Sequence, residues 1–110
     1  MAEALARHEQ MGASMAYERN VALDLEFTPV FSPVKPKGLG AEIIEVGASM
    51  LDANGVEIDT FSEPVRPTYA KGVSRQVRAV TGIRYNDLAH AKPFEEVLSR
   101  LVAWIGDCRH

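Results

Sequence analysis

The sequence shows few of the features that are typical of secreted and membrane proteins, such as paired cysteines and long apolar runs. Its 110 residues include one cysteine, Cys108, so no internal disulfide can form and a cytoplasmic location is expected. No apolar run approaches the ~20 residues that span a bilayer, and no secretion signal is visible at the N-terminus. The net charge of −3 excludes a generally basic surface, so any contact with nucleic acid has to come from a local patch.

The composition is that of one ordinary globular domain, with 46% apolar and 25% charged residues. Residues 1–19 are rich in Ala, Met, Glu and Arg and predict a helical extension or tail, whose apolar stripe is weak and interrupted by Gly12. The domain itself is expected over residues 20–110.

The first half of the domain predicts three strands, over residues 20–28, 42–52 and 56–67. Asn54-Gly55 is a strong hairpin cue between the last two, and three such strands make an antiparallel meander. The apolar phase shifts between Ile58 and Phe61, which predicts a bulge or bend. Residues 29–41 carry three prolines and two glycines and predict a loop that overhangs the end of the first strand, whose Lys35 and Lys37 either meet phosphates or are solvated.

The second half predicts helices. Ser74 is a plausible N-cap for a helix ending near Gly82, and residues 84–89 form another turn. Pro93 opens the clearest helix, which Gly106 is expected to stop. Its apolar stripe, expected to lie on a sheet face, consists of Phe94, Val97, Leu98, Leu101, Val102 and Ile105.

Two carboxylates stand one residue apart in the first strand, Asp24 and Glu26. In a strand they share one face, while Leu23, Leu25 and Phe27 share the other. Adjacent acids repel one another, and a divalent cation such as Mg²⁺ relieves that repulsion with hard oxygen ligands. The alternative is one solvated face of an antiparallel sheet. A nucleotide-binding P-loop is excluded, because the chain has no Gly-x-x-x-x-Gly-Lys-Ser/Thr segment.

These motifs occur in a recognisable order. Asp24-x-Glu26 is followed by Glu42-Ile43-Ile44-Glu45-Val46-Gly47-Ala48, Val65-Arg66-Pro67, Thr81-Gly82-Ile83 and the segment from Pro93 to Leu98. Over residues 20–107 the set resembles the 3′-5′ exonucleases with four catalytic acids, the DnaQ-like (DEDD) branch of the ribonuclease H-like fold. Within that branch it is most similar to the sporulation-inhibitor and Eri1-type exonucleases.

The resemblance implies an α/β fold, an incomplete ribonuclease H-like domain in which the meander precedes the helices. It also implies that Asp24 and Glu26 are catalytic ligands of two Mg²⁺ or Mn²⁺ ions about 3.5–4 Å apart. Phe27 and Thr28 match the place where the family holds the 3′-terminal nucleotide of single-stranded RNA or DNA. Glu42 and Glu45 match a structural motif, and neither is expected to bind metal.

A separate feature fits nucleic acid. Five basic residues and no acid lie between positions 66 and 84, namely Arg66, Lys71, Arg75, Arg78 and Arg84. They form either a phosphate-binding patch, to which Arg66, Arg75 and Arg78 are assigned, or a solvated helix face.

The family's second Asp, its final Asp and the His or Tyr beside it have no counterpart in the 110 residues. His8, His90 and His110 are each expected to be solvated. We therefore expect these 110 residues alone to have little or no catalytic activity. We expect the chain to be a truncated product or one half of a split protein. Missing strands would leave a sheet edge open for a second copy or a complementing chain. The rival hypothesis is a non-catalytic remnant that binds nucleic acid or self-associates.

Overall fold

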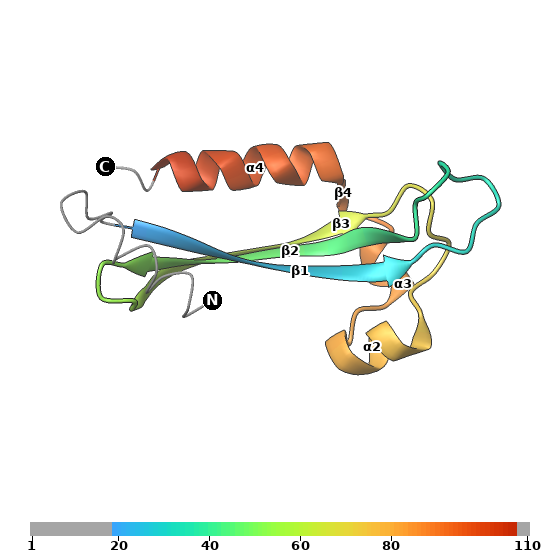
Figure 1. Cartoon of the computed structure of the whole chain (residues 1–110), viewed down its shortest axis with the longest axis horizontal. Coiled ribbons are helices and arrows are strands. Elements are labelled where there is room, and N and C mark those ends of the chain that lie inside the picture. The colour runs from blue at the N-terminus through green and yellow to red at the C-terminus, as the bar shows by residue number, and fades with distance from the viewer. Residues whose placement is uncertain (1–18, 108–110) are drawn as a thin grey trace.

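The computed structural model describes residues 19–107 (Figure 1). A sheet forms the centre, the long helix α4 (Phe94–Asp107) covers one face, and α2 (Arg75–Thr81) lies at one end of the opposite face with α3 (Tyr85–Leu88). Residues 1–18 of the predicted N-terminal extension (1–19), His8 among them, fall outside the described residues, as do Cys108 and His110, whereas Arg19 is the first residue of the first strand. No helix in the described part is long and apolar enough to cross a membrane.

The predicted antiparallel meander is confirmed. The strands are β1 (Arg19–Pro29), β2 (Ala41–Asp52) and β3 (Glu57–Arg66), and a two-residue strand, β4 (Lys92–Pro93), adds in parallel to β3. The order in this four-stranded sheet is β1-β2-β3-β4, so β1 is an edge strand within residues 19–107. The sequence did not predict β4, because two residues carry no periodicity.

Local turn chemistry explains the β2–β3 hairpin. The Asp52 carboxylate accepts the N–H groups of Asn54 and Val56 at 2.8 and 3.0 Å, and Gly55 takes a positive φ of 81°. A side chain that bonds the backbone two residues on stabilises the turn, and glycine supplies the left-handed conformation without strain.

Two bulges interrupt the ladders. The first is the expected one: Met50 pairs with Asp59 and Leu51 with Glu57, which leaves Ile58 as the extra residue of β3. The second was not predicted: Glu26 pairs with Glu45 but Phe27 pairs with Ile43, so Ile44 is the extra residue of β2. Ile44 is fully buried, which makes this bulge part of the packed interior.

The helix boundaries follow their caps. The Ser74 hydroxyl accepts the N–H of Val77, as the N-cap prediction requires, and Gly82 ends α2 with φ 76°. The prediction that Gly106 stops the last helix was wrong, since α4 continues through Asp107. Glycine weakens a helix but does not end one by itself.

The core lies between α4 and the sheet. Val97 and Leu101 of α4 pack with Val46, Ala48 and Val65 of the sheet. The expectation that the whole apolar stripe would be covered was wrong, because Phe94, Leu98 and Val102 stay 39%, 43% and 60% exposed.

Side-chain contacts explain this half-covered stripe. The Arg100 guanidinium donates a hydrogen bond to the Glu63 carboxylate at 2.6 Å, and the Trp104 indole N–H donates one to the Asp59 carboxylate at 2.9 Å. Both carboxylates belong to β3. These contacts hold α4 toward β3. Leu98 and Val102 lie on the opposite flank of α4, which faces β1.

Candidate catalytic and nucleic-acid-binding face

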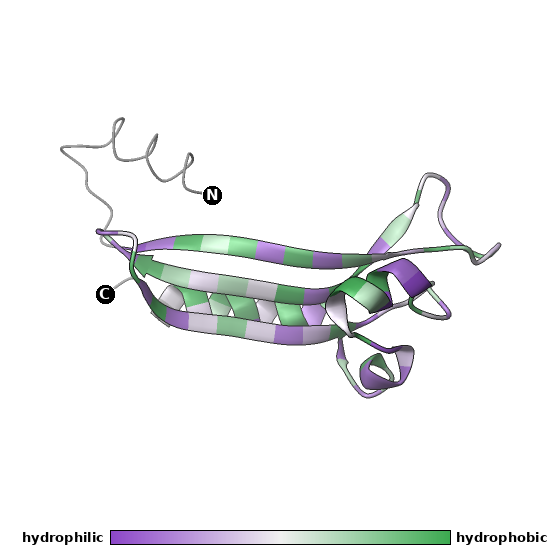
Figure 2. Ribbon diagram, turned by 90° about the horizontal axis from the view of Figure 1, so that it is seen from below, coloured by the Kyte–Doolittle hydropathy of each residue, from purple (hydrophilic) through white to green (hydrophobic). Residues whose placement is uncertain are grey.

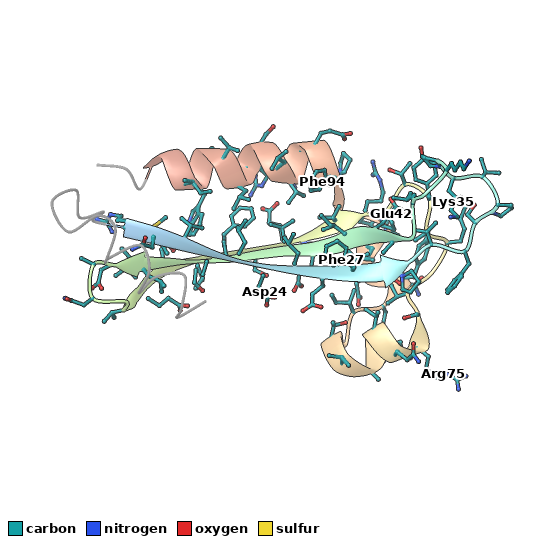
Figure 3. The ribbon with its side chains drawn as sticks, in the orientation of Figure 1. Asp24, Phe27, Lys35, Glu42, Arg75 and Phe94 are labelled. Atoms are coloured by element: carbon teal, nitrogen blue, oxygen red, sulfur yellow. The ribbon has the colours of Figure 1, made fainter. Side chains whose placement is uncertain are left out.

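Three carboxylates lie on the sheet face opposite α4, and we call Asp24, Glu26 and Glu45 the acidic face. Asp24 and Phe27 point to opposite sides of β1, as the strand alternation predicts (Figure 3). Glu26 lies two residues after Asp24 on the same face, and its cross-strand partner is Glu45 of β2. The two acids from the first motif thus gain a third neighbour that spacing along β1 did not reveal.

Gly47 keeps space around Asp24. It is the cross-strand partner of Asp24, and a Cβ at this position would lie 3.2 Å from the Asp24 carbonyl oxygen and 3.9 Å from its Cβ. The first distance is tighter than ordinary contact, so a side chain here would require the β1 backbone at Asp24 to shift by a few tenths of an ångström. A glycine opposite the acid therefore keeps the backbone of the acidic face in place.

The acidic face repels further negative charge. The pKa of Glu45 is raised above its ordinary value, first by partial burial and then by the charges of Glu26 and Asp24. The negative charges of these neighbouring carboxylates add to a local potential that attracts cations.

The donor chemistry fits a hard divalent cation, but only in part. Asp24 is exposed and Glu26 is half-buried, so both carboxylates can reach water or a ligand. Within residues 19–107, no three carboxylate, imidazole or thiol groups gather closely enough to hold a metal ion. An ion bound by Asp24 and Glu26 therefore needs further oxygens from water, phosphate or other polypeptide.

Basic side chains lie on the same side of the sheet. α2 carries Arg75 and Arg78, and Figure 3 shows Arg75 and Asp24 both on the side away from α4. Figure 2 looks onto this face, with α2 and α3 at one end of the strands and α4 behind them. Both arginines line an open pocket of about 480 Å³. The predicted Arg75–Arg78 pair and the acidic face thus share one side of the molecule.

Arg66 and Phe27 lie elsewhere. Both line a groove of about 350 Å³ on the α4 side, together with Glu42 and Phe94. The residues proposed from sequence to contact nucleic acid are therefore divided between the two faces of the sheet.

Thr28 connects the acidic face to α2. It lies two residues beyond Glu26, is fully buried, and its hydroxyl accepts the backbone N–H of Ser74 at 3.1 Å. Because Ser74 is the N-cap of α2, this bond fixes where α2 begins relative to β1.

Glu42 has a structural role, as its motif implied, through partners that the sequence did not reveal. One carboxylate oxygen accepts the N–H groups of Tyr69 and Ala70, both at 2.6 Å, and the other accepts that of Thr68 at 2.7 Å. These contacts hold the segment between β3 and α2. They join residues 26 to 28 positions apart, so no local sequence pattern could have revealed them.

Comparison with known proteins identifies the family. The family model described as Exonuclease (RNase_T) matches residues 21–110. Among solved structures, a full-length 3′-exonuclease superposes with a TM-score of 0.69 at 26% identity. The nuclease domain of 3′hExo, a DEDDh family member bound to rAMP, gives a TM-score of 0.69 at 27% identity. Cell-death related nuclease 4 (CRN-4), at 20% identity and a TM-score of 0.65, shares the fold.

The matches cover most of this chain but less than half of the other chains. They span 82%, 84% and 82% of this chain, against 29%, 46% and 30% of those three structures in the same order. A search of curated protein sequences gave no match. The sheet and helices match ribonuclease H-like exonuclease domains, as the motifs predicted, and the chain belongs to the RNase T-type exonuclease family, the DnaQ-like DEDD branch of that fold.

Proposed function

We propose that this chain supplies the first part of the active site of a metal-dependent 3′-5′ exonuclease that acts on the ends of single-stranded RNA or DNA. The observation that carries the proposal is the placement of Asp24 and Glu26 on the side of the sheet that also carries Arg75 and Arg78. Carboxylates suit a metal ion, and arginines suit phosphate. The nuclease domain of 3′hExo, to which this chain is similar, binds rAMP, which supports a nucleotide ligand for this chain.

Asp24 and Glu26 would hold Mg²⁺ or Mn²⁺, in the two-ion arrangement that the family resemblance implies. Such ions supply an activated water and stabilise the leaving oxygen in phosphodiester hydrolysis. Arg75 and Arg78 would bind the polynucleotide backbone beside that centre. The acidic face by itself repels phosphate, so binding of the scissile phosphate there depends on the cation.

Hydrolysis by these residues alone should be slow. The one histidine in the described part, His90, lies in the exposed turn between α3 and β4. No histidine within residues 19–107 is placed beside Asp24 and Glu26 to act as a general base, and general-base assistance is typically worth 10²–10⁴ in rate. Nucleic-acid and metal binding are thus the expected activities of the chain by itself.

Calorimetry and a cleavage assay test the proposal together. Mn²⁺ titrated into the protein should show uptake that the Asp24→Asn variant loses, with Asp87→Asn, an exposed acid in α3, as the matched control. A 5′-labelled single-stranded oligonucleotide should bind, and any cleavage should shorten it stepwise from the 3′ end. Unchanged Mn²⁺ uptake by the Asp24→Asn variant would contradict the proposal.

A second candidate function rests on the open edge of β1. Within the described residues its outer edge has no partner, and Leu23 and Leu25 are exposed on the side that faces Leu98 and Val102. We propose that this edge pairs with a strand of a second copy or of a complementing chain. Asp24→Asn should leave that association intact.

Sedimentation of the wild type and a Leu25→Lys variant tests the edge. The variant should sediment as a monomer at concentrations at which the wild type associates, because a charge on the apolar side of β1 opposes strand addition. Val80→Lys, at an exposed apolar position of α2, is the control. A wild type that stays monomeric throughout would exclude self-association.

A further inference from the structure

A second pocket lies beyond the end of β1, outside the acidic face. It encloses about 530 Å³ between the segment after β1 and the segment before α2. Pro29, Phe31 and Pro33 form one wall, and Lys71, Gly72 and Ser74 form the other. Val73 lines this pocket and also the open pocket that Arg75 and Arg78 line, so the two pockets adjoin.

Hydrogen bonds fix both walls. The Thr28 hydroxyl accepts the backbone N–H of Ser74, and the Glu42 carboxylate accepts the backbone N–H groups of residues 68 to 70, which directly precede Lys71. In the opposite wall, Val30 follows Pro29 and donates its backbone N–H to the carbonyl of Gly40 at 3.0 Å. A preformed pocket binds a ligand with less loss of conformational entropy than one that must be ordered on binding.

The lining chemistry suits an unpaired nucleobase and its phosphate. Phe31 is 83% exposed, so its ring is open to a stacking partner. Lys71 adds a cation to this pocket, Arg75 and Arg78 add cations to the adjoining one, and no acid lines either. Stacking on aromatic rings beside cations that follow the backbone is how proteins bind single strands.

The distance from the acidic face to this pocket can be spanned by a single nucleic-acid strand. β1 rises about 3.3 Å per residue, which places Pro29 about 10 Å beyond Glu26 and about 17 Å beyond Asp24. At about 3.4 Å per stacked nucleotide, a strand that starts at the acids reaches the pocket within about three to five nucleotides.

We propose that this pocket is a subsite for a nucleobase upstream of the 3′ end, stacked on Phe31 with a neighbouring phosphate on Lys71. The inference rests on the proposed function, because it requires a single strand whose 3′ end lies at the acidic face. It adds a residue contact and a length requirement that the nuclease proposal does not contain.

The test measures affinity against length. Fluorescence anisotropy with 5′-labelled oligouridylates, lengthened one nucleotide at a time in Ca²⁺ buffer, should show a step in affinity at about the third to fifth nucleotide. Phe31→Ala should weaken binding about 5- to 150-fold for oligomers beyond the step and leave shorter ones unchanged. Phe31→Trp should restore the step. Val34→Ala, at a 77% exposed position in the same loop but outside the pocket lining, is the matched control and should bind as wild type.

The outcomes separate the two proposals. If wild type binds long oligomers and Phe31→Ala binds them equally well at every length, the subsite is refuted while the nuclease proposal stands. If wild type binds none of the oligomers, the proposed nucleic-acid function fails, and the subsite fails with it. Lys71→Gln gives an independent check, because losing one phosphate contact should lower the salt slope of binding by about 0.7.

Discussion

Replacing Glu42 with alanine should destabilise the chain more than any surface substitution of similar size. The change removes a carboxylate that accepts three consecutive backbone N–H groups, from Thr68, Tyr69 and Ala70. Water can replace the bond to Thr68, which is exposed, but Tyr69 is half-buried and Ala70 is buried. The cost therefore comes mainly from the last two bonds.

The magnitude follows from those two bonds. A hydrogen bond to a charged group contributes about 1.5–3 kcal/mol, and two at the lower end amount to about 3 kcal/mol. Glu42→Gln should cost only about 1 kcal/mol, because the oxygen that accepts from both Tyr69 and Ala70 can be kept. At an m-value of about 1.5 kcal/mol/M, the alanine variant should lose about 2 M in its urea midpoint.

Urea unfolding followed by Trp104 fluorescence measures both variants. Glu96→Ala, an exposed acid in the first turn of α4, is the control and should cost under about 1 kcal/mol. If Glu42→Ala unfolds at the wild-type midpoint, the carboxylate does not hold the segment. If Glu42→Gln loses as much as Glu42→Ala, the retained oxygen does not act as described.

Three further predictions test the acidic face, α2 and the core. Glu45→Gln should raise the urea midpoint at neutral pH. Since the folded-state pKa of Glu45 is raised above its ordinary value of 4.5, the gain should shrink as the pH falls and vanish below 4.5, where the carboxyl is protonated in both the folded and the unfolded state. A pH-independent gain would exclude electrostatics as the cause. Arg75→Gln combined with Arg78→Gln should lower the salt slope of single-strand binding by up to about 1.4, whereas Arg66→Gln, on the other face, should leave it unchanged; equal effects would contradict the separation of the two sites. Leu101→Ala should cost about 2–5 kcal/mol in urea unfolding and Leu98→Ala about 1 kcal/mol or less, and equal losses would show that α4 covers β1 as fully as β3.

Several features of the fold could be predicted because they depend on near neighbours. Alternation of apolar and acidic residues along β1 is enough to predict that Asp24 and Phe27 lie on opposite faces of the strand, as they do. Asn54-Gly55 predicted the hairpin, and Ser74 predicted the start of α2. The ordered motifs predicted the family, which the match over residues 21–110 confirms.

The site was less accessible to sequence reasoning, because its geometry depends on contacts between distant segments. Arg66 and Arg75 lie in one basic run of the sequence, yet the turn between β3 and α2 sends them to opposite faces of the sheet. Thr28 matches a position at which the family holds a nucleotide, and the sequence did not reveal that its buried hydroxyl accepts the backbone N–H of Ser74. Glu45 joined Asp24 and Glu26 only through the register of β1 against β2.

The sequence by itself determined β1, β2 and β3, the cap of α2, the shared face of Asp24 and Glu26, and membership of the exonuclease family. Tertiary structure alone decided that α4 lies toward β3, that Ile44 bulges, and that Glu42 holds the segment before α2. The reason is physical. Side-chain periodicity and capping act over a few residues, whereas lateral packing, register and hydrogen bonds between distant segments depend on how the whole chain closes on itself.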